Sequence, residues 1–146
     1  MKYDVLIIRY GELALKGRNR ATFENLLVKH TKRLLADLSG WQLARPSRRW
    51  ILKLGNNDPN EIIKRLEKVF GYVSFSPAVL VENPTLEKLQ EIAVEFAEAK
   101  QGEKITFKVE TRRVDKKFPH DSYTVNSELG GAILEATEGR FSVDVH

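Results

Sequence analysis

The chain gathers four cationic side chains around two glycines close to its first residues. Residues 9–24 read Arg-Tyr-Gly-Glu-Leu-Ala-Leu-Lys-Gly-Arg-Asn-Arg-Ala-Thr-Phe-Glu, in which the cations are Arg9, Lys16, Arg18 and Arg20. An apolar run precedes this segment and an amphipathic pattern follows it, which predicts a turn before a helix N-terminus. Such a turn, lined with cations, is suited to binding phosphate groups. A basic loop that is only solvated is the alternative.

The same segment differs from the phosphate-binding loop of nucleotide triphosphatases. That loop places four residues between a glycine and a Gly-Lys-Ser/Thr sequence. Here five residues separate Gly11 from Gly17, and Arg18-Asn19 stands where Lys-Ser/Thr is required. No hydroxyl is placed to hold magnesium, so we expect no nucleotide triphosphate at this loop.

A second group of cations lies between residues 104 and 117. Apolar and polar residues alternate strictly from Lys104 to Arg112, which predicts a strand with one apolar face. The cations on the opposite face and in the following loop are Lys108, Arg112, Arg113, Lys116 and Lys117. Glu110 and Asp115 offset part of their charge, and the remaining positive charge along this row of cations can follow a phosphate backbone. A solvated edge strand protected by lysines is the alternative.

Other chemistry finds little support in the residue types. The chain has no cysteine, which excludes disulfides, thiolate nucleophiles and cysteine-based zinc sites. Its histidines, His30, His120 and His146, are scattered without the spacing of metal ligands. We therefore expect neither a catalytic residue nor a metal site in this chain.

Length and composition are those of one ordinary domain or two small ones, with 146 residues in all. The formal net charge of +4 is compatible with nucleic-acid binding without demanding it. No window approaches the length of a membrane-spanning apolar segment, and no secretory cleavage site follows the first strand. We therefore expect a cytoplasmic protein with no membrane partner.

The elements that position the first cations follow the order strand, helix, strand, strand, helix, strand. Apolar spacing and turn residues predict them at residues 3–9, 21–38, 41–45, 50–54, 59–70 and 72–81. Asn19 is expected to cap the first helix, and Asp58 with Pro59 to begin the second. This order is the ferredoxin-like unit, an antiparallel sheet with two helices on one face.

Apolar and aromatic residues on these elements are interpreted as core. The stripe of the first helix includes Leu26. The aromatic residues Trp41, Trp50, Phe70 and Tyr72 fall on or beside predicted elements, and we expect them to pack rather than to stack on bases.

A second region begins at residue 83. It contains a helix to about Lys100, the strand described above, a helix over residues 122–137 and a strand over residues 141–145. An isolated pair of strands is marginal in water. Either these strands join the first sheet, or residues beyond His146 complete the fold, which we favour. Gly130 and Gly131 interrupt the last helix, where close packing against another backbone or close approach of RNA would account for them.

Two ordered strings resemble known families. Tyr10–Gly17, followed by Arg18-Asn19-Arg20 and Phe23-Glu24, resembles the N-terminal signature of the ThiI family, the tRNA 4-thiouridine synthetases. Residues 107–119 and 127–131 are similar to the strand, loop and helix of THUMP domains, an RNA-binding module of several tRNA-modifying enzymes. The resemblance implies an α+β fold: a ferredoxin-like βαββαβ domain over residues 1–81, then a THUMP α/β domain, incomplete at its C-terminus, over residues 82–146.

By resemblance, these domains form the tRNA-binding N-terminal portion of a tRNA sulfurtransferase that makes 4-thiouridine; some members also supply sulfur for thiamine biosynthesis. They would dock the acceptor end of the tRNA and present the target uridine to a catalytic domain. The Ser-Gly-Gly-x-Asp-Ser loop of that domain does not occur here, and neither does the catalytic cysteine. The chain alone is thus not expected to be an enzyme. The parent protein would use ATP, magnesium and a sulfur-donor protein, and family members can form homodimers.

The expected RNA contacts are carried over as one cluster: Lys16, Arg18, Arg20, Lys108, Arg112, Arg113, Lys116 and Lys117. We expect the two domains to present them on one continuous positive surface. Two alternatives stay open. One is the RNA-binding part of another THUMP enzyme, such as a tRNA methyltransferase, and the other is a ferredoxin-like interaction domain with no RNA role.

Overall fold

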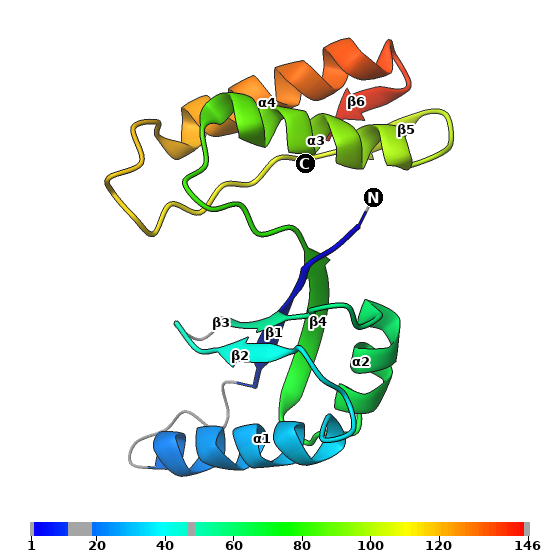
Figure 1. Cartoon of the computed structure of the whole chain (residues 1–146). Coiled ribbons are helices and arrows are strands. Elements are labelled where there is room, and N and C mark those ends of the chain that lie inside the picture. Colours follow the sequence, from blue (N-terminus) through cyan, green and yellow to red (C-terminus); the bar gives the residue numbers. More distant parts are fainter. Residues whose placement is uncertain (1, 12–18, 47–48, 145–146) are drawn as a thin grey trace. The chain divides into compact units, whose positions relative to one another are not determined.

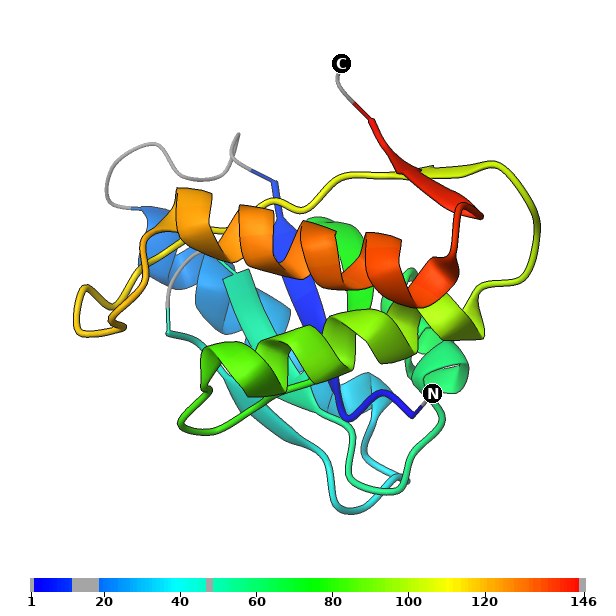
Figure 2. The ribbon, with the colours of Figure 1, turned by 90° about the horizontal axis from the view of Figure 1, so that it is seen from above.

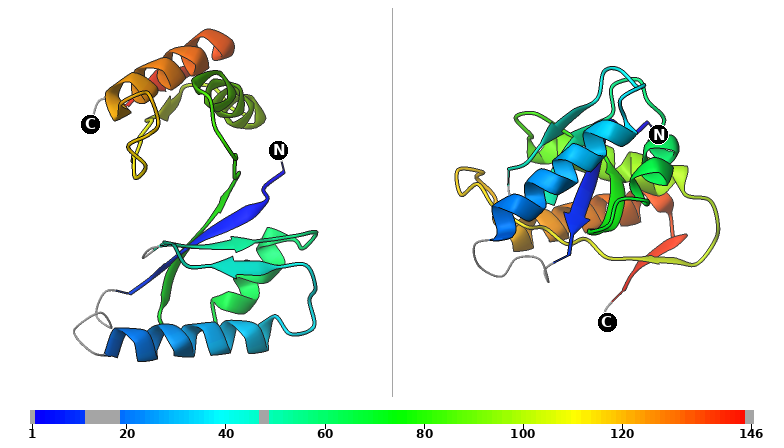
Figure 3. Two further views of the ribbon diagram at one scale, coloured as in Figure 1. Left: turned by 60° about the vertical axis from the view of Figure 1, so that its left-hand side comes forward. Right: turned by 90° about the horizontal axis from the view of Figure 1, so that it is seen from below.

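The computed structural model describes residues 2–11, 19–46 and 49–144. The chain divides into two compact units, Lys2–Leu80 and Val81–His146. Figure 1 labels the helices and strands of both units, and Figure 2 and Figure 3 give further views of the ribbon. None of the described helices combines the length and the apolar character needed to cross a membrane.

The first unit has the element order β1 (Val5–Tyr10), α1 (Arg20–Leu34), β2 (Gln42–Ala44), β3 (Arg49–Lys53), α2 (Pro59–Leu66) and β4 (Tyr72–Ala78). Its strands form an antiparallel sheet in the order β2-β3-β1-β4, so β1 is an inner strand. Helices α1 and α2 cover one face of this sheet (Figure 3, left). The βαββαβ arrangement predicted from the sequence is confirmed.

The sheet face under the helices carries an aromatic core. The ring centroids of Tyr10 and Trp50 lie 5.1 Å apart, and those of Trp50 and Tyr72 lie 6.2 Å apart. Trp41 packs beside this core, and its indole N–H donates to the Leu35 carbonyl at 3.1 Å. The packing role predicted for Trp41, Trp50 and Tyr72 is therefore confirmed.

The prediction that Phe70 packs in the core is wrong. Helix α2 ends at Leu66, and the Phe70 side chain is 91% exposed. Gly71 has a φ of +115°, and a Cβ at this position would lie 2.6 Å from Cζ of Phe23. Because the Phe23 ring fills the space beneath this turn, the chain reverses direction with the Phe70 side chain on the outside.

Helix α1 differs from its predicted form in length and in its buried stripe. It ends at Leu34 rather than near Leu38, and Leu26 is 47% exposed. The fully buried Thr31 shares a 2.6 Å hydrogen bond with the Tyr72 hydroxyl. This contact turns the Thr31 side of the helix toward the sheet and leaves the Leu26 side nearer to solvent.

The two predicted caps of the first unit have different outcomes. Asp58 accepts a hydrogen bond from the Asn60 backbone N–H at 3.1 Å, and Pro59 occupies the first turn of α2, as predicted. Asn19 makes no side-chain capping bond. Its backbone is already helical, with φ −84° and ψ −6°, whereas a capping residue needs an extended backbone to direct its side chain at the first N–H groups.

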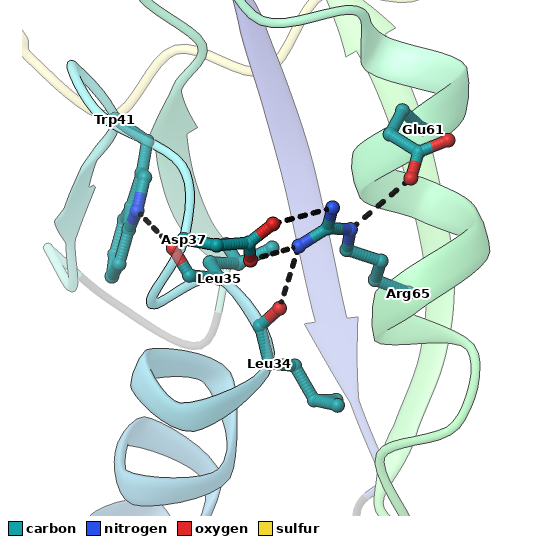
Figure 4. Close-up of polar contacts among 6 residues, drawn as sticks. All are labelled: Leu34, Leu35, Asp37, Trp41, Glu61 and Arg65. Atoms are coloured by element: carbon teal, nitrogen blue, oxygen red, sulfur yellow. Dashed lines mark hydrogen bonds and ion pairs between the residues drawn. The ribbon is translucent and has the colours of Figure 1, made fainter.

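Arg65 of α2 holds the end of α1 in place (Figure 4). Its Nη2 lies 3.0 Å from Oδ2 of Asp37, its Nη1 donates to the Leu34 carbonyl at 3.0 Å, and its Nε donates to Glu61 at 3.2 Å. The hydrogen bond from Arg65 lowers the pKa of Asp37. These contacts tie the two helices that cover the sheet.

The second unit has the element order α3 (Leu86–Ala99), β5 (Ile105–Phe107), α4 (Ser122–Thr137) and β6 (Phe141–Val143). Among the described residues, β5 and β6 pair in parallel as a separate two-stranded sheet. Helices α3 and α4 lie side by side (Figure 2). A small core of Ala97, Ile133 and Phe141 joins the helices to the strands.

The strand predicted over residues 104–112 is paired along only part of its length. Pairing stops at Phe107, where the three-residue partner β6 also stops, and the Asp144 N–H donates to the Phe107 carbonyl at 2.7 Å. The alternation nevertheless continues: Val109 packs against the small core, while Lys108 and Arg112 are exposed. The predicted cationic face is thus present without a paired strand behind it.

Gly130 and Gly131 lie within α4, as predicted. A Cβ on either residue would meet no described atom within 4 Å. Within the described residues, packing against another backbone is therefore the wrong explanation for these glycines.

Candidate nucleic-acid interface

The second unit contains a pocket at the loop between β5 and α4. This loop, the segment that leads into α3, and the first turn of α4 form its walls, and its volume is about 460 Å³. The cations that line it are Arg112, Arg113 and Lys117, all of them predicted phosphate contacts. We call this cavity the basic pocket.

Hydrogen bonds hold the loop that carries these cations. At its start, the Thr111 hydroxyl donates to the Asn126 side-chain carbonyl at 2.6 Å, which ties the loop to α4. At its tip, the Asp115 carboxylate accepts from the Lys117 backbone N–H at 2.9 Å. A loop that is held by its own polar groups loses less conformational freedom when a ligand binds.

Helix α4 begins directly after the loop. Its cap is Asp121, whose carboxylate accepts from the Thr124 backbone N–H at 2.7 Å. This hydrogen bond lowers the pKa of Asp121, with smaller contributions from the charges of Arg113 and His120. The Asp121 carboxylate is thus engaged in capping α4.

The basic pocket has a net positive charge. Among its described lining residues, Asp115 is the one carboxylate, against the three cations Arg112, Arg113 and Lys117.

Apolar and aromatic groups lie beside the cations in the basic pocket. The rings of Phe118 and His120 meet edge to face, with centroids 5.8 Å apart, and Val114 is 84% exposed. Cations attract phosphate, while apolar and aromatic surfaces accept the faces of bases and sugars. The combination suits an unpaired nucleotide, since a paired helix has its base faces covered.

Two other predicted cations of the second unit do not line the basic pocket. Lys108 pairs with Glu110 through an Nζ–Oε1 distance of 3.1 Å, and both side chains are exposed, so the pair adds little stability. Lys116 contributes its backbone carbonyl, which accepts from Arg113 Nη2 at 2.6 Å. The structure therefore distinguishes three pocket cations from two that lie outside the pocket.

In the first unit, Arg20 is the one predicted phosphate contact within the described residues; Lys16 and Arg18 lie outside them. Arg20 lies in the first turn of α1, and its Nε is 3.0 Å from Oε1 of Glu24. The neighbouring Tyr10 side chain and the hydrogen bond to Glu24 raise the pKa of Arg20. A phosphate at this position would compete with Glu24 for the guanidinium. The continuous surface expected across both domains stays a prediction.

The sheet of the first unit brings together two cations that were not selected as phosphate contacts. Its register places Arg9 of β1 opposite Arg49 of β3 and beside Ser74 of β4. Their neighbours Ile8 and Trp50 are buried under the helices, so alternation directs these side chains to the opposite face. Like charges that lie directly opposite each other across two strands repel. The alternation of buried and exposed residues in β1 could have identified Arg9 as an outward-facing cation from the sequence. Only the strand register shows that Arg9 lies opposite Arg49.

The described residues contain no group of three or more histidine, aspartate or glutamate side chains arranged to hold a metal ion. The polar groups that converge at the basic pocket are mainly cations. The chemistry that this arrangement supports is the binding of anions.

Family models match both units. Residues 5–76 match the ThiI ferredoxin-like domain, and residues 83–146 match the THUMP domain. Both matches agree with the fold class and the order of domains predicted from the sequence.

Curated relatives of the chain are probable tRNA sulfurtransferases. The one from Staphylococcus saprophyticus subsp. saprophyticus is 43% identical over 148 residues, which covers 100% of this chain and 35% of the relative. The one from Staphylococcus aureus strain bovine RF122 is 44% identical over 136 residues, which covers 92% of this chain and 33% of the relative. The chain therefore spans about a third of the length of these relatives.

Two solved structures share the fold. A 4-thiouridine synthetase in complex with RNA and bound ATP superposes with a TM-score of 0.79 and 31% identity, covering 99% of this chain and 36% of that chain. The protein PH1313 from Pyrococcus horikoshii superposes with a TM-score of 0.78 and 34% identity, covering 97% of this chain and 47% of that chain.

Proposed function

Because the chain belongs to the ThiI family through its ferredoxin-like and THUMP domains, we propose that it supplies the tRNA-binding part of a tRNA sulfurtransferase. Its role is to bind the acceptor end of a tRNA and to present the uridine that becomes 4-thiouridine. The observation that carries this proposal is the basic pocket, where Arg112, Arg113 and Lys117 meet an apolar surface.

Recognition would rest on phosphate contacts and on shape. The major groove of an A-form helix is too deep and narrow for side chains to read its bases, whereas unpaired ends expose theirs. The pocket offers cations for the phosphates of such an end and the Phe118 ring for a base or sugar. A folded tRNA with an unpaired end has both features.

The chemical steps are proposed for segments of the relatives that this chain does not span. The chain has no cysteine, so no thiolate of its own can carry sulfur. ATP, magnesium, a sulfur-donor protein and any link to thiamine biosynthesis belong to this proposal for the parent enzyme. A similar solved structure, a 4-thiouridine synthetase, contains bound ATP and RNA.

A titration of the chain against a tRNA transcript at several salt concentrations tests the proposal. Neutralisation of about five phosphates would give a slope of log affinity on log salt of about −3.5 to −4.5. Binding that is absent, or that does not change with salt, would reject the RNA role and favour a protein-interaction domain. A transcript without its unpaired 3′ nucleotides serves as the comparison, and it should bind more weakly.

A further inference from the structure

Among the described aromatic residues of the first unit, Phe70 stands apart by its exposure. Its side chain is 91% exposed, and Val73, three residues later, is 69% exposed. The other aromatic rings of this unit are buried or half-buried, and several of them pack against one another around Tyr10 and Trp50. Phe70 is thus an aromatic surface that the core does not use.

The outward position of Phe70 is built into the backbone. The turn at Gly71 requires a positive φ, and the Phe23 ring occupies the space on its inner side. The Gly11 N–H donates to the Gly71 carbonyl at 2.8 Å, which anchors this turn to the end of β1. Because both sides of the turn are held, Phe70 cannot rotate into the core without breaking packed contacts.

A shallow pocket adjoins the ring. Its lining includes Phe23, Phe70 and Val73, together with one carboxylate, Glu67, and one cation, Lys68. Phe23 lies one helical turn after Arg20 in α1, so this predicted phosphate contact, which pairs with Glu24, begins the helix that supplies Phe23 to the pocket. Lys68 supplies a second cation at the lining itself.

We propose that Phe70 is a stacking platform for an unpaired RNA base, with Lys68 and Arg20 as the flanking cations. This inference rests on the proposed function and adds to it a contact in the first unit. An exposed aromatic ring beside cations is the arrangement by which proteins hold single-stranded nucleic acid, since every base has a face that can stack. A second copy of the chain fits less well, because a stable protein interface buries about 800 Å² per partner around an apolar centre, and Phe70 and Val73 form only a small patch.

The test compares Phe70→Ala, Phe70→Trp and a matched control, Leu26→Ala. Leu26 is also an exposed apolar residue of the first unit, but it does not line this pocket. We expect Phe70→Ala to weaken tRNA binding by about 5- to 140-fold, the range found for loss of one stacked base. Phe70→Trp should restore binding, and Leu26→Ala should leave it unchanged.

The salt dependence identifies the contact as stacking. Removal of a neutral ring should leave the slope of log affinity on log salt unchanged, whereas removal of a phosphate contact reduces it. The loss should appear with a tRNA and not with a fully paired RNA duplex. A Phe70→Ala chain that binds tRNA normally, or that loses tRNA and duplex equally, would overturn the inference.

Two further outcomes separate this inference from its premise. If the wild-type chain does not bind tRNA at all, the proposed function and this inference both fail. If the wild-type chain binds and Phe70→Ala has no effect, only the stacking contact fails. Sedimentation of the wild-type and Phe70→Ala chains tests whether Phe70 binds a second copy of the chain instead of RNA. A change in oligomeric state would assign Phe70 to a protein interface and overturn the RNA contact.

Discussion

Lys116 and Lys117 are adjacent residues of the same type in the same loop, yet only Lys117 lines the basic pocket. The bond between the Asp115 carboxylate and the Lys117 N–H sets this turn, and the Lys116 carbonyl is turned toward the Arg113 guanidinium. Consecutive residues of such a turn point their side chains in different directions. Residue type therefore predicts a basic loop, and the backbone decides which of its cations meet at one site.

This difference predicts unequal effects of two alanine substitutions. Lys117→Ala should weaken tRNA binding and make the slope of log affinity on log salt less steep by about 0.7 to 0.9, because one phosphate contact is lost. Lys116→Ala is the matched control, and its slope should stay close to that of the wild type. Titrations over a salt series measure both. An equal or larger effect of Lys116→Ala would contradict the assignment of the pocket cations.

At the scale of the elements, α4 contains a pair of adjacent glycines that its own packing does not explain. Glycine within a helix costs about 1 kcal/mol relative to alanine, and a Cβ at Gly130 or Gly131 would meet no described atom within 4 Å. Gly71 is the opposite case, since its φ of +115° and its closeness to Phe23 both require the absence of a side chain. Gly71 is thus required by the fold, whereas Gly130 and Gly131 are not required by the described contacts of α4.

Alanine substitutions at these two kinds of site should change the free energy of unfolding in opposite directions. Gly130→Ala and Gly131→Ala should each raise the free energy of unfolding by about 1 kcal/mol, because the helix gains propensity and the added Cβ displaces no described atom. Gly71→Ala should lower it by about 1 kcal/mol or more, because alanine is strained at that φ. Urea unfolding followed by circular dichroism measures all three. Loss of tRNA affinity in a stabilised Gly130→Ala or Gly131→Ala chain would show that RNA approaches α4 closely.

At the scale of the whole molecule, the cations are divided between two compact units, each with its own hydrophobic core. Arg20 belongs to the first unit, and Arg112 belongs to the second. Two modules that bind one ligand molecule together reinforce each other, because the second contact forms within an existing complex. The expected shared surface therefore has a consequence that can be measured in solution.

If both units bind the same tRNA, Arg20→Ala and Arg112→Ala should each make the salt slope less steep by about 0.7 to 0.9, and the double variant should do so by about 1.4 to 1.8. Salt-series titrations of the four chains measure this. Lys108→Ala is a control of the same charge change, since Lys108 pairs with Glu110 outside the basic pocket. An Arg20→Ala chain with an unchanged slope would leave tRNA binding to the second unit alone.

The sequence by itself determined the order of elements and the two domains' families. Apolar periodicity and turn residues are local properties, so the βαββαβ order, the Asp58 cap and the alternation around Lys108 could be read from it. The strings around Gly11 and Arg112 carried the family resemblance, which the matches to the ThiI ferredoxin-like and THUMP domains confirm.

Only the tertiary structure decided which side chains face outward together. Phe70 has the residue type of the core, but the turn at Gly71 and the Phe23 ring place it in solvent. The strand after Lys104 ends its pairing where β6 ends, and Arg9 meets Arg49 through the register of β1 and β3. These outcomes depend on contacts between residues far apart in the chain, and such contacts leave no trace in the spacing of neighbouring residues.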